Sequence, residues 1–418
     1  MTKAPDVLRT HKLQLRTVTP VSIGADEADA LSPYADYVIE GDAIVLLDKR
    51  KVEKAVLDAG LLDDYVIGIG DSMESNPNRS GFNLGLFIKE KLKKAPRDLA
   101  LRIMPNRGIE QHRKQSVAAI VKEAGKAYLP GSSLKGAFRT AVLYDWLTAT
   151  EKGSEELVKY KNALHSLELA AADVGRLKRI FEQKRLRSEF NAAKKHLRDQ
   201  EKRFFVEDNL FGRLNDGPES RFLRFSDSSM APDDAVGLYG IKRIRLQPNP
   251  KVVGRESEMP TPREALFSNS ALTATLNIVP AFASDSVLKY WVDQSMDEVL
   301  GLLNQFTKDC ISNELYELRE ADNRDFRKVI DQMEDFYVDL EDKAKNGGVF
   351  LRMGFGKTVY DNSLTLAMLN GLPGQDGENA FKSYRTNMLG VKGSARNYPV
   401  TRTVTADGLP LGWVEITL

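Results

Sequence analysis

The chain has 418 residues, of which 42% are hydrophobic and 28% charged, and its formal net charge is +1. Such a length exceeds what one typical core serves, so we expect two domains of roughly similar size in an ordinary globular protein. The overall charge cannot attract nucleic acid, so any such function has to come from local patches.

The N-terminal residues, the cysteine and the histidines exclude several classes of protein. The first dozen residues carry charges and no apolar run, so we expect no signal peptide, no membrane anchor and a cytoplasmic protein. Cys310 is the only cysteine, which excludes an internal disulfide and a multi-thiolate zinc site, and its helical spacing predicts a buried structural thiol. The histidines have no metal-ligand spacing, so we expect neither a metal nor a cofactor; they are His11, His112, His165 and His196.

The first hundred residues alternate between strand and helix patterns. Leu13 and Leu15 alternate with polar residues, which predicts a strand that ends in a turn at residues 19–24. Residues 37–47 have the pattern of a hairpin, and a helix is expected after residue 52. Residues 68–81 are polar and rich in turn formers, so we expect an exposed loop that a partner orders.

Residues 129–140, LPGSSLKGAFRT, combine a helix start with two basic residues. Pro130 and Gly131 break the preceding segment, and Ser132 or Ser133 is a candidate helix cap. Apolar residues then recur every four positions, which predicts a buried face; they are Leu134, Phe138, Val142 and Trp146. Lys135 and Arg139 lie one turn apart near a helix N-terminus that attracts anions, although many helices that bind nothing begin in this way.

The middle of the chain contains a basic block. Residues 176–203 hold eleven Lys or Arg against four acidic residues, a net charge of +7, on a helical pattern that is either a solvated face or a phosphate-tracking surface. Strands are expected at residues 222–225, 241–246 and 272–278. We place a domain boundary near residue 232, which gives domains 1–232, with a basic helical insertion around 151–210, and 233–418.

The second half has two long helical patterns, at about 288–303 and 326–340. Residues 314–345 contain eleven acids against six bases, so this surface should repel RNA and face water or a basic protein.

A glycine-rich segment follows at residues 347–358, GGVFLRMGFGKT. A Walker A loop needs a glycine five positions before Gly356, where Leu351 stands, so an ATPase is excluded by spacing. Gly354 and Gly356 can still let the backbone approach a phosphate or base, beside Arg352, Lys357 and the stacking face of Phe355. The alternative is a tight turn that needs glycine only for its backbone conformation.

Five motifs together resemble those of the RAMP proteins, the RNA-binding subunits of type III CRISPR effector complexes. The sequence PGSSLKGAFR at residues 130–139 resembles the signature motif of that family, and RMGFGK at 352–357 resembles its C-terminal glycine-rich loop. The turn VSIG at 21–24, the tetrapeptide NLFG at 209–212 and the ending LPLGWV at 409–414 are also similar. Within the family, the chain most resembles the terminal subunit of the type III-A (Csm) complex.

The resemblance implies an α+β fold with two ferredoxin-like, RRM-type domains and helical insertions. It implies a non-catalytic subunit that caps the 3′ end of the guide RNA (crRNA), supports its maturation in antiviral defence, and contacts the target RNA backbone. Implied partners are other Csm-complex RAMP subunits and host trimming nucleases. The residues expected at the RNA are Gly131, Ser132, Ser133, Lys135, Arg139, Arg352, Gly354, Phe355, Gly356 and Lys357.

Two alternatives remain open. A RAMP-family endoribonuclease would process guide or target RNA without metal, using a loop aspartate or a histidine base to activate a ribose 2′-hydroxyl. Its candidate residues are His11, Asp26, Asp29 and Asp36. The other alternative is a protein-binding scaffold in which the basic block meets an acidic neighbour.

Overall fold

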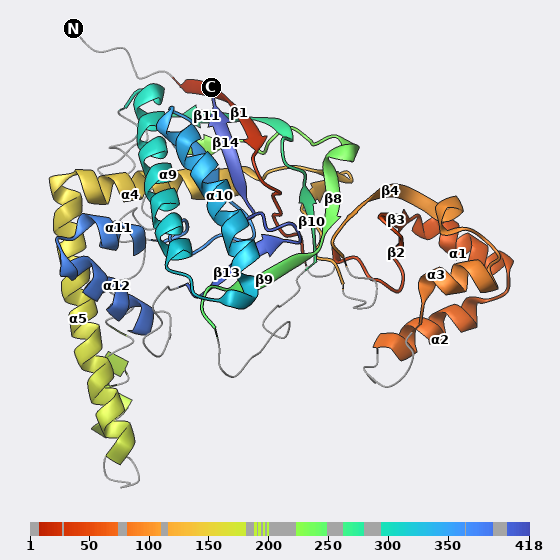
Figure 1. Cartoon of the computed structure of the whole chain (residues 1–418), viewed down its shortest axis with the longest axis horizontal. Coiled ribbons are helices and arrows are strands. Elements are labelled where there is room, and N and C mark those ends of the chain that lie inside the picture. Colours follow the sequence, from red (N-terminus) through yellow and green to blue (C-terminus); the bar gives the residue numbers. More distant parts are fainter. Residues whose placement is uncertain are drawn as a thin grey trace.

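The computed structural model has an α+β fold built on two mixed layers of strands and helices (Figure 1). It describes residues 8–26, 29–73, 82–109, 116–180, 223–248, 262–279, 294–363, 365–387 and 399–418, together with short helical pieces between 188 and 199. Within these residues no helix combines the length and apolar character needed to cross a bilayer.

A five-stranded antiparallel sheet forms the centre of the molecule. Its order is β12 (Phe350–Arg352), β14 (Trp413–Thr417), β1 (Arg9–Thr17), β11 (Ala271–Ile278) and β7 (Leu223–Phe225). The predicted alternation in β1 is confirmed, because Leu13 and Leu15 are buried while Lys12, Gln14 and Arg16 are exposed. In register, Leu15 pairs with Leu272 on one side and with Ile416 on the other, which continues the apolar surface across the three central strands.

Long helices cover this sheet. Helix α4 (Gly131–Ala149) contacts the edge strands β7 and β12, and α9 (Met296–Arg319) packs on α4, on β12 and on α10 (Arg327–Lys345). The predicted apolar stripe of α4 is confirmed, since Leu134, Phe138 and Val142 are buried and Trp146 is half-buried. Helix α5 (Glu151–Ile180) extends away from the body, and α11 (Thr365–Gly371) and α12 (Gln375–Asn387) pack beside it (Figure 1).

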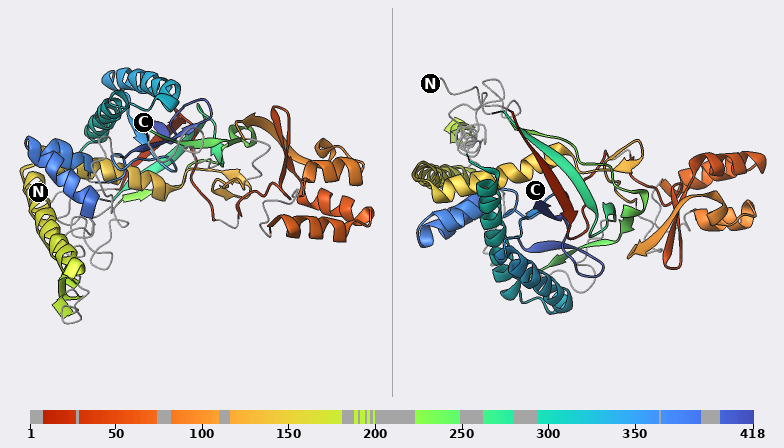
Figure 2. Two further views of the ribbon diagram at one scale, coloured as in Figure 1. Left: turned by 60° about the horizontal axis from the view of Figure 1, so that its bottom comes forward. Right: turned by 90° about the horizontal axis from the view of Figure 1, so that it is seen from above.

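A second sheet connects the body to a small lobe. Its order is β10 (Arg263–Leu266), β8 (Val236–Tyr239), β4 (Ala100–Arg107), β3 (Ala43–Leu47) and β2 (Tyr37–Glu40), with β4 and β8 parallel. Helices α1 (Lys49–Asp58), α2 (Leu62–Met73) and α3 (Leu84–Leu86) pack near β2–β4 around a core of their own, and a π-helical stretch, Phe87–Lys91, follows α3. This lobe projects from the body in every view of Figures 1 and 2.

Two further strand pairs complete the fold. They are β5 (Lys122–Glu123) with β6 (Lys126–Ala127), and β9 (Ile241–Arg245) with β13 (Thr401–Thr405). Short 3-10 turns occupy Pro96–Leu99, Asp233–Ala235 and Arg324–Phe326.

The predicted boundary near residue 232 does not separate the two sheets. The central sheet takes β1 and β7 from before that point and β11, β12 and β14 from after it. The second sheet likewise combines β2–β4 with β8 and β10. Each sheet therefore combines strands from both halves of the chain. Residues 1–232 and 233–418 do not form separate cores.

Some predicted segments need correction. The expected loop at 68–81 is wrong at its start, because α2 continues to Met73 and residues 74–81 lie outside the described ones. The first long helix of the second half begins at Met296, capped by Ser295, while residues 280–293 lie outside the described ones. The basic block is confirmed as helical through Ile180; most of its remainder and the motif at 209–212 also lie outside them.

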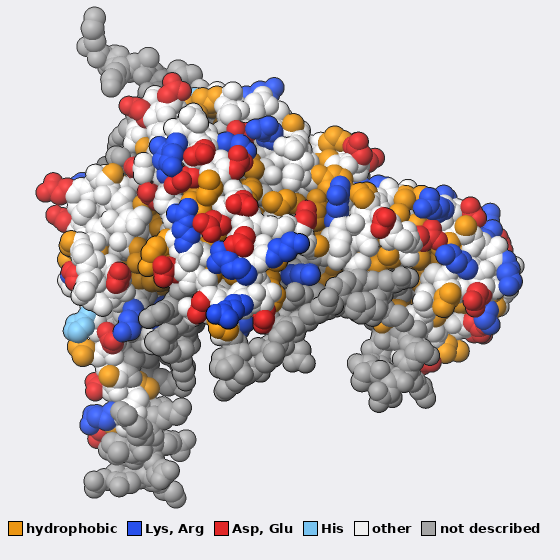
Figure 3. Space-filling view, viewed as in Figure 1, with side chains coloured by type: hydrophobic (Ala, Val, Ile, Leu, Met, Phe, Trp, Pro, Cys, Tyr) orange, Lys and Arg blue, Asp and Glu red, His pale blue; other side chains and the backbone are white. Residues whose placement is uncertain are grey.

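The predicted acidic surface of the second half is more balanced than its composition indicates. On α10, Lys343 pairs with Asp339 at 2.5 Å and Lys345 with Glu341 at 2.8 Å. Arg319 of α9 reaches Glu334 of α10 at 2.8 Å. Red and blue side chains accordingly alternate over α9 and α10 in Figure 3. This face therefore presents mixed charge, in which ion pairs neutralise several of the acids.

A buried ion network joins α9 to β12 and β13. The guanidinium of Arg402 donates from Nε to Oε2 of Glu314 at 2.7 Å, and Arg352 lies 3.8 Å from the other oxygen of the same carboxylate. Glu317, one turn further along α9, accepts a hydrogen bond from the Tyr360 hydroxyl at 3.3 Å. Burial raises the pKa of Glu317 to about 7; Arg402 opposes this rise and Glu314 adds to it.

The titration of Glu317 predicts a pH-dependent stability. Between its ordinary pKa near 4.5 and its folded pKa of about 7, the unfolded chain releases this proton and the folded chain keeps it. The free energy of unfolding should therefore fall by about 3 kcal/mol as the pH rises through that window, and stay level above it. In Glu317→Gln this fall should be absent, as measured by urea unfolding at pH 5 and pH 8.

Asp335→Asn is the matched control, because Asp335 is exposed on the neighbouring helix α10 and is not among the charges that shift the pKa of Glu317. The control should keep the pH dependence of the native chain. An equal fall in stability in the native chain and in Glu317→Gln would contradict the assignment.

Candidate nucleic-acid interface

The glycine-rich loop that follows β12 is held in one conformation by close packing. Gly354 and Gly356 have φ of +72° and +98°, in the region that favours glycine. A Cβ built on Gly354 would lie 2.4 Å from the carbonyl oxygen of Ser22, and one built on Gly356 would lie 3.1 Å from Cβ of Leu411. Both glycines are thus required by backbone conformation and by their neighbours.

The buried side chain of Arg352 joins the two ends of this loop. Its Nε donates to the Leu411 carbonyl at 2.9 Å, and Nη1 donates to Oδ2 of Asp361 at 3.1 Å. The other Asp361 oxygen accepts from the backbone N–H and the hydroxyl of Thr358 at 2.7 and 2.8 Å. Burial lowers the pKa of the guanidinium, but Tyr337, Asp361 and Glu314 raise it overall, so Arg352 stays charged.

The expectation that Arg352 contacts RNA is corrected by this environment. Its side chain has no exposed surface, and its charge is compensated by the carboxylates of Asp361 and Glu314. A guanidinium in this position cannot reach a phosphate at the surface. Arg352 is therefore a positioning residue that fixes the start of the loop relative to its end.

Three of the four motif segments that lie within the described residues meet at this loop. The Phe355 N–H donates to the Ser22 carbonyl at 2.8 Å, which joins the glycine loop to the turn at 20–24. Gly412 donates to Pro20 at 3.0 Å and accepts from Met353 at 2.8 Å, which joins the C-terminal motif to both. Segments from the beginning and the end of the chain thus build one structure at one end of the central sheet.

An exposed lysine and a half-buried aromatic ring with an arginine over it lie at this loop. Lys357 is exposed and its Nζ donates to Oδ1 of Asn362 at 2.7 Å; partial desolvation lowers its pKa from the ordinary value. The guanidinium of Arg263 lies 3.5 Å from the centroid of the Phe355 ring, and burial lowers its pKa. The sequence does not single out Arg263, which lies between the strands expected at 241–246 and 272–278. The sequence around Arg263 does not mark it as a binding residue, because Phe355, the ring beneath it, is 92 positions away.

The start of α4 differs from the prediction in its cap. The helix begins at Gly131 with Pro130 as N-cap, and neither Ser132 nor Ser133 caps it with a side chain. Instead, Oδ1 of Asp227 accepts the Gly131 N–H at 2.7 Å. The helix N-terminus therefore already holds a carboxylate, which takes the place expected for a phosphate. Gly131 is buried, and a Cβ there would lie 2.5 Å from the Phe225 carbonyl oxygen.

The basic residues of α4 lie beside this capped end. Lys135 and Arg139 are half-buried, and both are engaged with neighbouring groups. Ser132 is exposed and Ser133 half-buried. The α4 start adjoins β7, whereas the glycine loop follows β12, so they share one end of the central sheet at opposite edges. Four strand spacings separate these edges, roughly 19 Å.

The candidate nuclease residues do not form one site. His11 lies in β1 six residues before the end that adjoins the glycine loop, a distance of roughly 20 Å along the strand. Burial and Arg9 lower its pKa. Asp36 is buried, accepts from Ser32 N–H at 2.6 Å and pairs with Lys49 at 3.0 Å, which gives it a structural role. Asp26 and Asp29 are exposed in the turn after β1.

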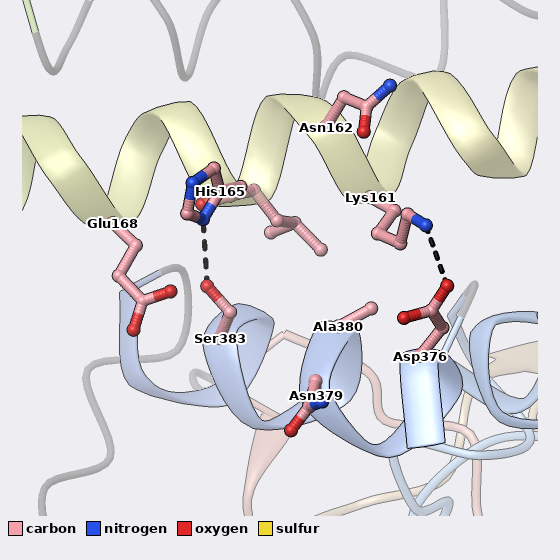
Figure 4. Close-up of a pocket in the computed structure, with 9 residues that line it drawn as sticks. Lys161, Asn162, His165, Glu168, Asp376, Asn379, Ala380 and Ser383 are labelled. Atoms are coloured by element: carbon pink, nitrogen blue, oxygen red, sulfur yellow. Dashed lines mark hydrogen bonds and ion pairs between the residues drawn. The ribbon is translucent and has the colours of Figure 1, made fainter. Parts of the chain in front are cut away.

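A separate pocket of about 220 Å³ lies between α5 and α12 (Figure 4). Its groups carry both signs, and two of them point at one another, since Nζ of Lys161 lies 2.7 Å from Oδ2 of Asp376. Ser383 donates to the Leu164 carbonyl at 3.4 Å across the same gap. His165 and Glu168 complete the polar lining, so the pocket has no dominant charge for a nucleic acid.

Metal and thiol chemistry find no support in the part of the chain that the structure describes. There, no group of three His, Cys, Asp or Glu side chains is placed to hold a metal ion. Cys310 is buried in the main core, as predicted, and burial raises its thiol pKa well above the usual value.

Comparison with known proteins identifies relatives over nearly the whole chain. A sequence model described as the RAMP superfamily matches residues 14–332. A protein of Methanocaldococcus jannaschii named "CRISPR system Cms protein Csm5" is 25% identical over 439 residues, covering 98% of this chain and 89% of that protein.

Two solved structures share the fold. One is a chain of a cryo-EM structure of a Csm–crRNA–target RNA ternary complex of a type III-A CRISPR-Cas system, with TM-score 0.66 and 21% identity over 98% of this chain and all of the other. The other is the crystal structure of T. onnurineus Csm5, with TM-score 0.58 and 20% identity over 96% of this chain and 99% of the other.

The packing around Gly354 predicts a large effect of one methyl group. Gly354→Ala should lower the free energy of unfolding by about 2 kcal/mol or more, because it combines an unfavourable φ with the clash against Ser22. Gly347→Ala is the matched control, since Gly347 also has a positive φ, +92°, but nothing lies within 4 Å of its added Cβ. Urea unfolding of both variants checks this; equal losses would show that the close approach is unimportant.

Proposed function

We propose that this chain, which belongs to the RAMP superfamily, is a non-catalytic RNA-binding subunit of a type III-A CRISPR effector complex. In that role it holds the backbone of the guide RNA at its 3′ end and supports guide maturation in antiviral defence. Its partners are the guide RNA, the target RNA backbone, other RAMP subunits of the Csm complex and host trimming nucleases, in the cytoplasm.

The construction of the glycine loop is the observation that carries the proposal. A loop that holds an exposed lysine beside a half-buried aromatic ring suits a single strand, because a phosphate can meet the cation while a base lies against the ring. The buried pair of Arg352 and Asp361 holds this loop rigid, so little ordering cost accompanies binding. The M. jannaschii relative, by its name, and the solved Csm–crRNA–target RNA complex point to the same class of assembly.

Binding of this kind reads no spacer sequence. In RNA-guided complexes, base pairing between guide and target carries the sequence information while protein holds the backbone. The local cations near the loop and at the α4 start supply attraction that the overall charge of +1 does not. We therefore expect RNAs of unrelated sequence to bind with similar affinity.

The endoribonuclease alternative has weaker support. A general base has to lie within hydrogen-bond reach of the 2′-hydroxyl that it activates, with the phosphate held nearby. His11 lies toward the other end of β1 from the glycine loop, and Asp36 is already paired with Lys49. Asp26 and Asp29 remain exposed, but the described residues place no second catalytic group with them.

The RNA-binding proposal predicts a specific loss of affinity. The triple variant Lys135→Ala, Arg139→Ala, Lys357→Ala should bind short unstructured RNA at least about tenfold more weakly, because it loses charge-assisted contacts to phosphate. The dependence of affinity on salt should flatten by about 0.7 in log–log slope for each phosphate that is no longer neutralised. Filter binding or fluorescence anisotropy across a salt series measures both.

Lys328→Ala is the control, because Lys328 is an exposed cation on α10. Its binding curve and salt slope should match those of the native chain, and thermal melting should show that all variants fold. Unchanged affinity in the triple variant would contradict the assigned site. Metal-independent cleavage of the RNA that is lost in His11→Ala or Asp26→Ala would replace the non-catalytic role with the nuclease.

A further inference from the structure

One face of the second sheet aligns two arginines across three neighbouring strands. Arg263 of β10 is opposite Tyr239 of β8, and Tyr239 is opposite Arg107 of β4. Directly paired residues point to the same face, so the three side chains form a row about two strand spacings long, roughly 10 Å. The row lies where β8 and β10 join the body to the projecting lobe (Figure 1).

Each arginine of the row lies over a phenylalanine ring. The Arg263 guanidinium is 3.5 Å from the centroid of Phe355, which belongs to the glycine loop. The Arg107 guanidinium is 5.7 Å from the centroid of Phe267, which follows β10. The Phe267 ring in turn packs against Tyr239, with centroids 6.1 Å apart. The row is therefore continuous with the glycine loop at one end and extends toward the lobe at the other.

The arginines carry charge that neighbouring acids do not compensate. Among the described residues, no carboxylate forms an ion pair with Arg263 or with Arg107, and Nε of Arg263 is buried without a hydrogen-bond partner. Glu264, the next residue along β10, is buried and pairs with Lys122 at 2.7 Å. Asp407 acts on Tyr239 electrostatically and is exposed. Arg263 and Arg107 thus leave positive charge at this face.

Close packing fixes the geometry of the row. The ring of Phe267 fills the space above Gly237, where an added Cβ would lie 2.4 Å from the ring. Tyr239 is buried together with Ala265 and Leu411, and burial raises its pKa to about 12, so it stays a neutral platform. An arginine whose plane rests on an aromatic ring is pre-organised, which reduces the ordering cost of binding a ligand.

We propose that this row, defined by Arg263, Tyr239 and Arg107 with the rings of Phe355 and Phe267, is a second contact surface for single-stranded RNA. It continues the path of the strand from the glycine loop toward the lobe. Arg107 is exposed and Arg263 half-buried; both guanidiniums contact phosphates, and the exposed guanidinium of Arg107 gives a base a flat surface. This inference rests on the proposed RNA-binding function and names an RNA contact that extends it.

The chemistry favours RNA over an acidic protein segment as the occupant. Arginine side chains held over aromatic rings match a ligand that combines anionic phosphates with flat bases. An acidic peptide needs only the charge and would leave the planar surfaces unused. The row also begins at Phe355, the ring that the glycine loop presents to the same strand.

The test measures binding of fluorescent, unstructured RNA to the full chain across a salt series. Arg263→Gln with Arg107→Gln should weaken binding by about tenfold or more and flatten the log–log salt slope by about 1.4, because two phosphates are no longer neutralised. Arg97→Gln is the matched control, because it removes an exposed arginine of the lobe that pairs with Glu40, and it should leave the slope unchanged. Thermal melting verifies that each variant is folded.

Two further variants separate stacking from charge. Arg263→Lys keeps the positive charge but removes the planar guanidinium. Its affinity for RNA should therefore fall, while the dependence of affinity on salt stays that of the native chain. Phe355→Leu should lose affinity, and its effect should not add to that of Arg263→Gln, because the two residues act as one stack. Should the double arginine variant fail to fold, these single changes decide the matter, since full affinity in both would overturn the inference.

Comparing the two sets of variants tests the arginine row separately from the proposed RNA-binding function. If the arginine variants bind normally while the Lys135, Arg139 and Lys357 variant does not, the row is overturned and the proposed function stands. If the native chain binds no RNA, the proposed function itself fails. If polyglutamate binds to the native chain and the arginine variants lose only that binding, the row serves an acidic protein neighbour and the inference is wrong.

Discussion

The buried guanidinium of Arg352 is the constraint on which the candidate site depends. It ties the start of the glycine loop to Asp361 at the loop's end and to the Leu411 carbonyl of the C-terminal motif. Removing one partner of such a pair leaves an uncompensated buried charge and typically costs about 3–5 kcal/mol. The same carboxylate of Glu314 serves Arg352 and Arg402, so the loop is anchored to α9 and to β13 together. An otherwise irregular segment of the chain thereby becomes a fixed surface.

This rigidity explains how a nearly neutral chain can hold an anionic strand. The large surfaces carry mixed charge, as on α10, and the pocket between α5 and α12 pairs its own ions. Within the described residues, attraction is concentrated instead where a few cations lie beside half-buried rings or backbone at one end of the central sheet. Even there, the carboxylate of Asp227 occupies the N-terminus of α4. RNA can therefore contact the side chains of α4 but not the Gly131 N–H at its N-terminus. Among the described residues, the glycine loop and the arginine row therefore carry most of the proposed binding.

The sequence was informative where local patterns decide structure. The alternation of β1, the hairpin of β2 and β3, the apolar stripe of α4 and the buried Cys310 follow from spacing alone, and all are confirmed. The resemblance to RAMP subunits of the Csm type, which rested on five motifs, is also confirmed by the family match and the relatives. What failed depended on long-range contacts. Arg352 looked like an RNA contact because its partners Asp361 and Glu314 cannot be inferred from its neighbours, and Arg263 could not be predicted because Phe355 is distant in sequence.

Photo-crosslinking locates the RNA on the protein. Single-stranded RNA carrying photoreactive uridines is bound to the full chain, irradiated, and the linked peptides are identified by mass spectrometry. We expect crosslinks at residues 354–357, at 20–24 and at the start of α4, and none on the exposed face of α10. Crosslinks confined to α10, or to the helices around the α5–α12 pocket, would contradict the proposed RNA-binding surface.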